Sequence, residues 1–163
     1  MRHDGCDGDH TVLAEAYLRA AEEDERTARI LEPFVEEVPH NICMMVSRAC
    51  EKYLKAKSMY LNGRTRNVHD LLELVDSLGD IPDRRDAMRA ASVLDDYPTQ
   101  ANYPSRTRDR IGVGEATRAL ELMDRLVSII DPRDPRVHGE VLMDRFCVCS
   151  QRSCINRVQE YKC

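Results

Sequence analysis

The stretch from Ile42 to Tyr60, ICMMVSRACEKYLKAKSMY, determines the fold of this chain. Apolar residues recur along it at alternating steps of four and three: Ile42, Val46, Ala49, Tyr53, Ala56 and Tyr60. This spacing is typical of one face of an α-helix, and it continues to the helix-breaking pair Asn62-Gly63. Further apolar side chains widen that face: Cys43, Cys50, Leu54 and Leu61. We therefore expect a long helix at the centre of a helical bundle.

The same period recurs on both sides of this stretch and predicts four further helices. They are expected over residues 11–31, 67–79, 84–97 and 113–130. Asn67 is suited to cap the helix that follows it, with Asp70 in its first turn. Residues 98–110 show no period and form the longest predicted internal loop. Since no segment alternates like a β-strand, the predicted fold is all-α, a four-helix up-and-down bundle with one additional short helix.

The length of the chain predicts one domain with two tails. A single bundle is expected over residues 12–131, between an N-terminal tail of residues 1–11 and a polar, cysteine-containing tail of residues 132–163 with at most one further helix. A chain of this size buries about two thirds of the surface that its unfolded form exposes. We therefore expect it to fold without disulfides and without a cofactor.

Charge and cysteine usage predict a cytoplasmic protein without a membrane segment. The net charge of −5 argues against a general nucleic-acid binder, so a nucleotide or RNA must be held at a local site. No stretch approaches the roughly 18 consecutive apolar residues of a membrane span, and residues 1–5 lack the apolar core of a signal peptide. The odd number of cysteines, seven, favours reduced thiols.

The C-terminal cysteines do not form a recognisable zinc-binding pattern. Zinc binds four tetrahedrally arranged thiolates or imidazoles in structural sites. The available side chains are Cys147, Cys149, Cys154 and Cys163, with His138 upstream. Their spacing matches none of the common structural zinc patterns, so no metal site is expected.

Three further motifs give the chain a family resemblance. They are the string CEKYLKA at residues 50–56, the string NVHDL at residues 67–71, and a tyrosine-proline element that runs from Asp96-Tyr97 to Asn102-Tyr103-Pro104. In this order and spacing, with a glycine turn after the first motif, the chain resembles the HEPN domain over residues 12–131.

The resemblance implies a binding module. HEPN domains are four-helix bundles, often homodimers, that occur beside or fused to minimal nucleotidyltransferases in prokaryotes, and nucleotide binding is proposed for part of the family. The broad apolar face of the helix at residues 42–60 is a second reason to expect a homodimer. The family usually has Arg-Tyr-Pro in the last motif, whereas this chain has Asn102, so an anion contact of that arginine is lost or passes to Arg106.

The alternative is a metal-independent dimeric ribonuclease, such as a toxin of a toxin–antitoxin pair. Some relatives use an Arg-x4–6-His motif across a dimer interface, and Arg64 and His69 fit the form with four intervening residues. Histidine can act as an acid or base near neutral pH, while a guanidinium holds a phosphate by two hydrogen bonds. Thr65 departs from the motif, because Asn, Asp or His usually follows the arginine.

Six residues are candidates for binding a nucleotide or its phosphates: Lys52, Lys55, Arg66, His69, Tyr103 and Arg106. Each has a structural alternative. The lysines fit a solvated helix face with a Glu51–Lys55 pair. His69 fits a position that packs the start of a helix, and Tyr103 fits packing as well as base stacking. Alternatively, His69 lines a phosphate site at the exposed N-terminal amides of the helix that follows it.

Overall fold

We describe residues 9–102 and 110–134 of a computed structural model. Within these residues the secondary structure is helical throughout, which confirms the predicted all-α fold. The elements are α1 (Asp9–Leu31), the 3-10 turn η1 (Glu32–Phe34), α2 (Pro39–Asn62), α3 (Leu71–Ser77), α4 (Arg84–Leu94), α5 (Tyr97–Asn102) and α6 (Val113–Ile130). Tyr103, Arg106 and the cysteines of the C-terminal tail lie outside the described residues.

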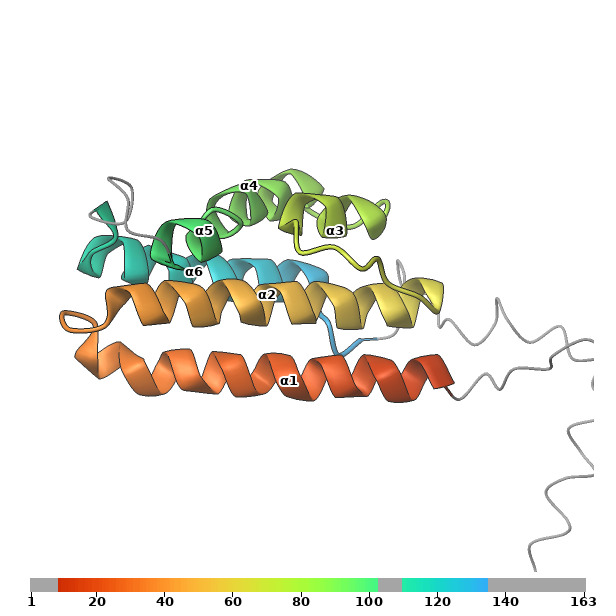
Figure 1. Cartoon of the computed structure of the whole chain (residues 1–163). Coiled ribbons are helices and arrows are strands. Elements are labelled where there is room, and N and C mark those ends of the chain that lie inside the picture. The colour runs from red at the N-terminus through yellow and green to blue at the C-terminus, as the bar shows by residue number, and fades with distance from the viewer. Residues whose placement is uncertain (1–8, 103–109, 135–163) are drawn as a thin grey trace, which may run out of the picture.

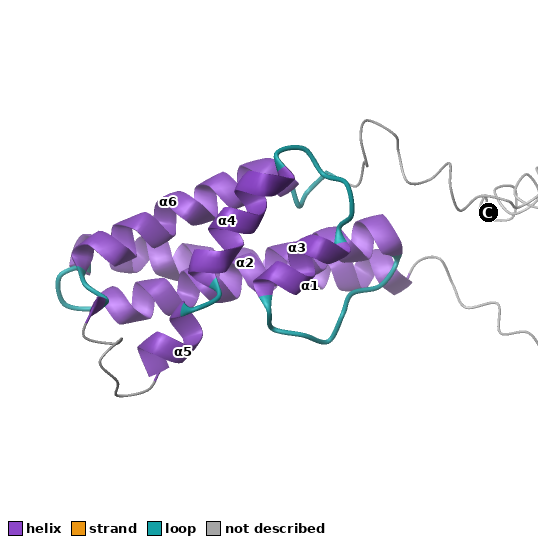
Figure 2. Ribbon diagram, turned by 90° about the horizontal axis from the view of Figure 1, so that it is seen from above, coloured by secondary structure: helices purple, strands orange, loops and turns teal. Residues whose placement is uncertain are grey.

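The four longer helices, α1, α2, α4 and α6, form a bundle with α2 at its centre (Figure 1). α1 runs along one side of α2, and α6 lies along another side with α4 packed against it. The short helices α3 and α5 complete the face of the bundle that α4 occupies, as the view from above also shows (Figure 2). α2 therefore has helices on most of its circumference.

The position of α2 explains the width of its apolar face. Its residues from Tyr53 to Met59 are all buried, which no surface helix would show. Cys43 and Cys50 are free thiols within this buried face. The helix ends where Gly63 adopts a φ of 65° and donates its N–H to the carbonyl of Met59 at 2.9 Å. Periodicity and the Asn62-Gly63 breaker thus predicted this helix correctly.

The burial of α2 removes one of the two reasons for expecting a homodimer. The apolar stripe that suggested a contact between chains is covered by α1, α6 and α5 of the same chain. It is therefore core and not interface.

The start of α3 differs from the prediction. Asn67 does not cap this helix; the cap is Asp70, whose Oδ1 accepts the N–H of Glu73 at 2.9 Å. Both residue types suit the position. Asp70 has the advantage because the first amide of the helix, that of Leu71, donates to Asp95 Oδ1 at 2.8 Å. A contact with a distant segment therefore selects the cap.

A second difference is α5, which occupies part of the predicted loop. Tyr97 begins this helix and is only 2% exposed. Its hydroxyl donates to Glu115 Oε2 of α6 at 3.0 Å. Burial of a large aromatic ring stabilises the helical turn, although its sequence, YPTQAN, has no apolar period of its own.

The described helices include none that is both long enough and apolar enough to cross a membrane.

Candidate functional site

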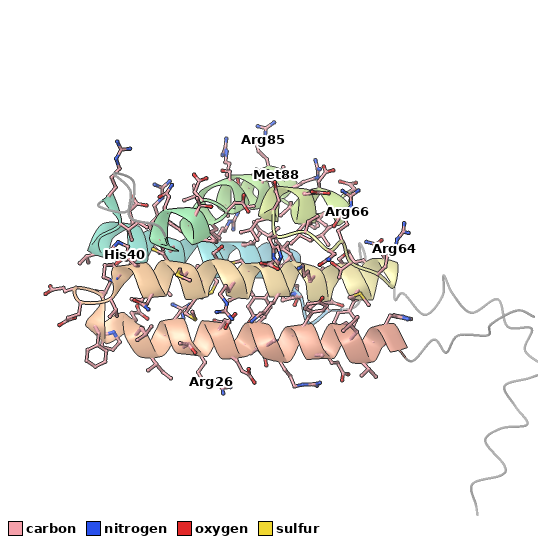
Figure 3. All side chains as sticks on the ribbon, viewed as in Figure 1. Arg26, His40, Arg64, Arg66, Arg85 and Met88 are labelled. Atoms are coloured by element: carbon pink, nitrogen blue, oxygen red, sulfur yellow. The ribbon has the colours of Figure 1, made fainter. Side chains whose placement is uncertain are left out.

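The loop between α2 and α3, residues 63–70, carries Arg64, Arg66 and His69. Arg64 and Arg66 extend from the end of the bundle at which α2 stops (Figure 3). Arg64 is exposed, and its carbonyl accepts the hydroxyl of Ser58 at 3.0 Å, which holds the loop to the last turns of α2. No described carboxylate forms an ion pair with the Arg64 guanidinium. Arg66 in contrast forms an ion pair with Glu73 of α3.

His69 is held by a carboxylate from the middle of α2. Its Nδ1 lies 2.9 Å from Oε1 of Glu51, although the imidazole is 83% exposed. The same oxygen of Glu51 accepts from Lys55 Nζ at 2.7 Å, and Lys55 is only 5% exposed. Because an ionised carboxylate only accepts hydrogen bonds, Nδ1 carries a proton in this contact. Nε2 is then the nitrogen left for a ligand or for proton transfer.

Lys52 faces α1. Its ammonium binds the carboxylate of Asp24, which is only 8% exposed and also forms an ion pair with Arg48, 3.4 Å from its Nε. The two candidate lysines of α2 are therefore neutralised by carboxylates of the chain itself: Asp24 for Lys52 and Glu51 for Lys55. The expected Glu51–Lys55 pair is present, but the expected solvated face is not, because Lys55 is only 5% exposed.

The start of α3 is occupied by carboxylates. The amides of Leu71 and Glu73 donate to Asp95 and Asp70, so they are not available to a phosphate. Burial raises the pKa of Asp95, and the nearby carboxylates of Asp70, Asp96 and Glu51 raise it further, while the Leu71 amide opposes the shift. An anion near this helix end would meet the same negative charges.

Among the predicted residues with defined positions, Arg64 and, through its Nε2, His69 thus remain open to a ligand. They lie on one loop, but the other candidates within the described residues are engaged by the chain's own carboxylates. Glu51 and Asp95 were not among the predicted site residues. Glu51 could have been found, because it stands four residues before Lys55 inside CEKYLKA. Asp95 gave no signal, since its contact with Leu71 spans 24 residues.

Comparison with known families decides the identity of this bundle. The HEPN domain matches residues 14–132, which is most of the chain. The chain belongs to the HEPN domain family. The predicted resemblance is therefore confirmed.

Two solved structures share the HEPN fold with this chain. TT1696 from Thermus thermophilus is similar with a TM-score of 0.63 and 25% identity, over 72% of this chain and 95% of that one. ST0689, described as an archaeal HEPN homologue, has a TM-score of 0.58 and 18% identity, over 74% of this chain and 96% of that one. No curated protein matches the chain significantly.

Among the residues with defined positions, no three His, Cys, Asp or Glu side chains are grouped so that they could hold a metal ion.

Proposed function

We propose that this HEPN domain is a binding module that pairs with a minimal nucleotidyltransferase and binds a nucleotide phosphate through Arg64 and His69. The observation that carries this proposal is the exposure of that pair on the loop 63–70. With the imidazole 83% exposed, one chain does not enclose a ligand there. Small-molecule sites bury most of their ligand, so a second chain must complete the site. Membership of the HEPN family supports a nucleotidyltransferase as that chain.

Co-expression tests the pairing. The chain is produced together with the nucleotidyltransferase encoded nearest to its gene, and the complex is sized by chromatography with light scattering. We expect the wild type to form one complex and Arg64→Glu to lose it, because the proposal places the loop 63–70 in the interface between the two proteins. Two separate proteins in the wild-type sample would overturn the pairing.

Calorimetric titration with ATP and GTP tests the nucleotide. We expect Arg64→Ala to weaken binding about tenfold, because it removes a charge-assisted hydrogen bond to phosphate. Arg26→Ala is the control, since Arg26 is exposed on α1 at the opposite side of the bundle (Figure 3). Equal effects of the two variants would show that binding follows overall charge and not this loop.

The second candidate is a metal-independent ribonuclease, acting as a homodimer. The hydrogen bond between His69 and Glu51 favours it, because a carboxylate that orients the imidazole is a common arrangement for a general acid or base. In a dimer, one His69 would accept the proton of the attacking 2′-hydroxyl and the other would protonate the leaving oxygen, with Arg64 on the phosphate.

RNA cleavage in the presence of EDTA tests this second candidate. The comparison is wild type against His69→Ala, Glu51→Gln and the control Glu23→Gln, whose side chain is exposed on α1. Cleavage abolished by the first variant and reduced by the second, with the control unaffected, would establish the ribonuclease. An intact RNA in all samples would exclude it and leave the binding module.

A further inference from the structure

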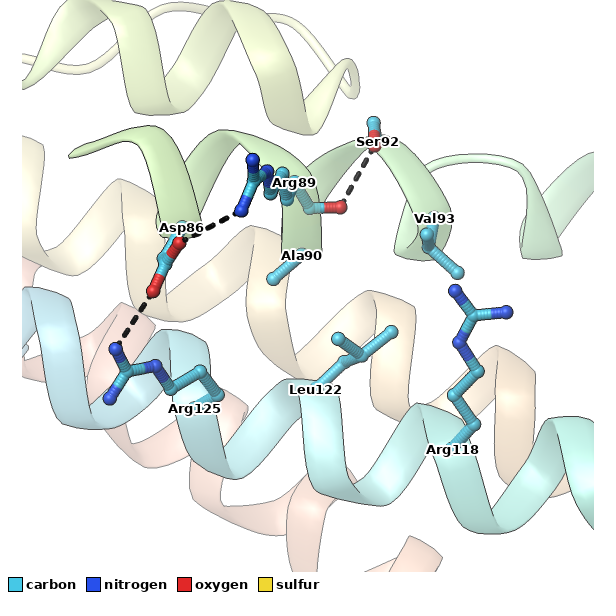
Figure 4. A pocket seen from close by; sticks show the side chains of 8 residues that line it. All are labelled: Asp86, Arg89, Ala90, Ser92, Val93, Arg118, Leu122 and Arg125. Carbon is cyan, nitrogen blue, oxygen red and sulfur yellow. Dashed lines mark hydrogen bonds and ion pairs between the residues drawn. The ribbon is translucent and has the colours of Figure 1, made fainter. Parts of the chain in front are cut away.

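A second cationic surface lies between α4 and α6, apart from the loop 63–70. It is a groove of about 420 Å³, which we call the α4–α6 groove. Its lining consists of Asp86, Arg89, Ala90, Ser92 and Val93 of α4 and of Arg118, Leu122 and Arg125 of α6 (Figure 4). The groove thus combines an apolar floor with a charged rim.

The rim carries an excess of positive charge. Three arginines line the groove against one aspartate, in a chain whose net charge is −5. Asp86 is shared, since its carboxylate lies 2.9 Å from Arg125 and 3.5 Å from Arg89. Arg118 is exposed and forms no ion pair with any described carboxylate. Arg125 also lies 3.7 Å from Asp83, so two aspartates balance two of the three arginines, and the guanidinium charge of Arg118 is left to attract an anionic partner.

The floor is made of aliphatic side chains. Ala90 is buried, and Val93 and Leu122 are half-buried and lie between the arginines (Figure 4). None of the lining residues is aromatic. Proteins that bind single-stranded nucleic acid combine positive charge with aromatic side chains on which the bases stack. An aliphatic floor between two helices instead fits the apolar face of a third helix.

The charge of the rim also argues against a second copy of this chain. In a two-fold symmetric contact the same surface meets itself. Each copy would bring the same three arginines and one aspartate, so two surfaces with the same excess of positive charge would meet, which is unfavourable. A partner with acidic side chains beside an apolar stripe satisfies both the rim and the floor.

We propose that the α4–α6 groove is a docking site for an acidic amphipathic helix of a partner protein. Leucine-like side chains of that helix lie on Ala90, Val93 and Leu122, and its flanking carboxylates pair with the arginines of the rim. This inference goes beyond the function proposed above and does not depend on what the loop 63–70 binds.

A labelled synthetic peptide tests the site on the full chain. The peptide is a helix of about four turns with leucines along one face and glutamates on the flanks, and its counterpart has lysine in place of each glutamate. We expect saturable binding of the acidic peptide, followed by fluorescence anisotropy, and at least about tenfold weaker binding of the basic one.

Two double variants with the same change of charge locate the binding. Arg89→Glu with Arg118→Glu is expected to weaken the acidic peptide about tenfold or more. The matched control is Arg19→Glu with Arg26→Glu on α1, where both side chains are exposed, and it should alter binding less than about twofold. Leu122→Ala, checked for folding by circular dichroism, should weaken binding at high salt, where charge is screened and only the floor contributes.

Three results would overturn the proposal. Equal weakening by both double variants would show attraction by overall charge. Single-stranded RNA could displace the peptide. If RNA binding is then lost in Arg89→Glu with Arg118→Glu but kept in the control variant, the groove is a nucleic-acid site. A concentration-dependent dimer that disappears in Arg89→Glu with Arg118→Glu would assign it to a second copy of the chain.

Discussion

At the scale of single residues, two acidic side chains control what the basic residues of α2 can do. Asp24 forms ion pairs with Lys52 and Arg48, and Glu51 contacts both Lys55 and His69. Lys55 is only 5% exposed, and burying an ammonium group without a paired carboxylate is costly. These side chains therefore stabilise the contacts between helices, and of the site residues predicted from the sequence that have defined positions, Arg64 and the Nε2 of His69 can still meet a ligand.

Removing Asp24 should destabilise the contact between α1 and α2. In Asp24→Ala the ammonium of Lys52, whose side chain is 24% exposed, loses its carboxylate. We expect the free energy of unfolding in urea to fall by about 2 kcal/mol. The control is Glu23→Ala, next to it but exposed, which should change the free energy by less than about 0.5 kcal/mol. Equal values for the two variants would contradict this role of Asp24.

Asp95 should make stability depend on pH. Its pKa is raised in the folded protein, chiefly by burial, whereas in the unfolded chain the carboxyl loses its proton near pH 4 (about 3.9). Unfolding therefore releases a proton from about pH 4 upward to the folded pKa, and the free energy of unfolding falls as the pH rises through this window.

Asp95→Asn tests that dependence, because asparagine keeps an oxygen for the Leu71 amide but does not titrate. We expect the wild type to lose stability relative to the variant as the pH is raised from about 4 to 7, followed by urea unfolding at each pH. A difference that is constant over this range would show that the Asp95 carboxyl has its ordinary pKa.

At the scale of elements, the long helices follow from local apolar patterns, whereas the short ones depend on contacts with the rest of the bundle. α6 spans Val113–Ile130, as its apolar period predicted. α3 has only seven residues, too few for a helix to be stable by itself. Its formation depends on the cap and on the packing of Leu71, Leu74 and Val75 into the core.

The cap of α3 can be tested with two substitutions. Asp70→Ala removes the acceptor of the Glu73 amide and should reduce the free energy of unfolding by about 1 kcal/mol. Asn67→Ala changes a residue that suits a cap by type but is exposed and outside the helix, and it should have almost no effect. A larger loss of stability in Asn67→Ala than in Asp70→Ala, measured by thermal or urea unfolding, would show that Asn67 is the cap.

At the scale of the whole molecule, the residues after α6 connect the two sides of the bundle. Arg133 donates to Glu22 of α1 at 2.7 Å and lies over the ring of Tyr53, 5.7 Å from its centre. Pro132 is fully buried, and Lys57 of α2 donates to the carbonyl of Asp134 at 2.6 Å. The segment 131–134 thus joins α6 to α1 and α2, and the domain boundary expected at residue 131 stays a prediction.

Two truncations test that boundary. A chain that stops after Asp134 keeps these contacts and should unfold within about 0.5 kcal/mol of the full chain. A chain that stops after Ile130 loses the buried proline, the cation–π contact and the hydrogen bonds, and should be less stable by about 2–3 kcal/mol. Equal stability of the two would place the boundary before residue 131.

The sequence by itself determined the helical class and the central place of α2, because apolar periodicity acts over three or four residues, and its three motifs gave the resemblance to the HEPN family. Only the tertiary structure decided which carboxylate each lysine meets, which of Asn67 and Asp70 caps α3, and that YPTQAN is helical. Those outcomes depend on contacts such as Asp24 with Lys52 and Leu71 with Asp95, which are 28 and 24 residues apart. The packing of helices creates such pairs, and no local pattern encodes them.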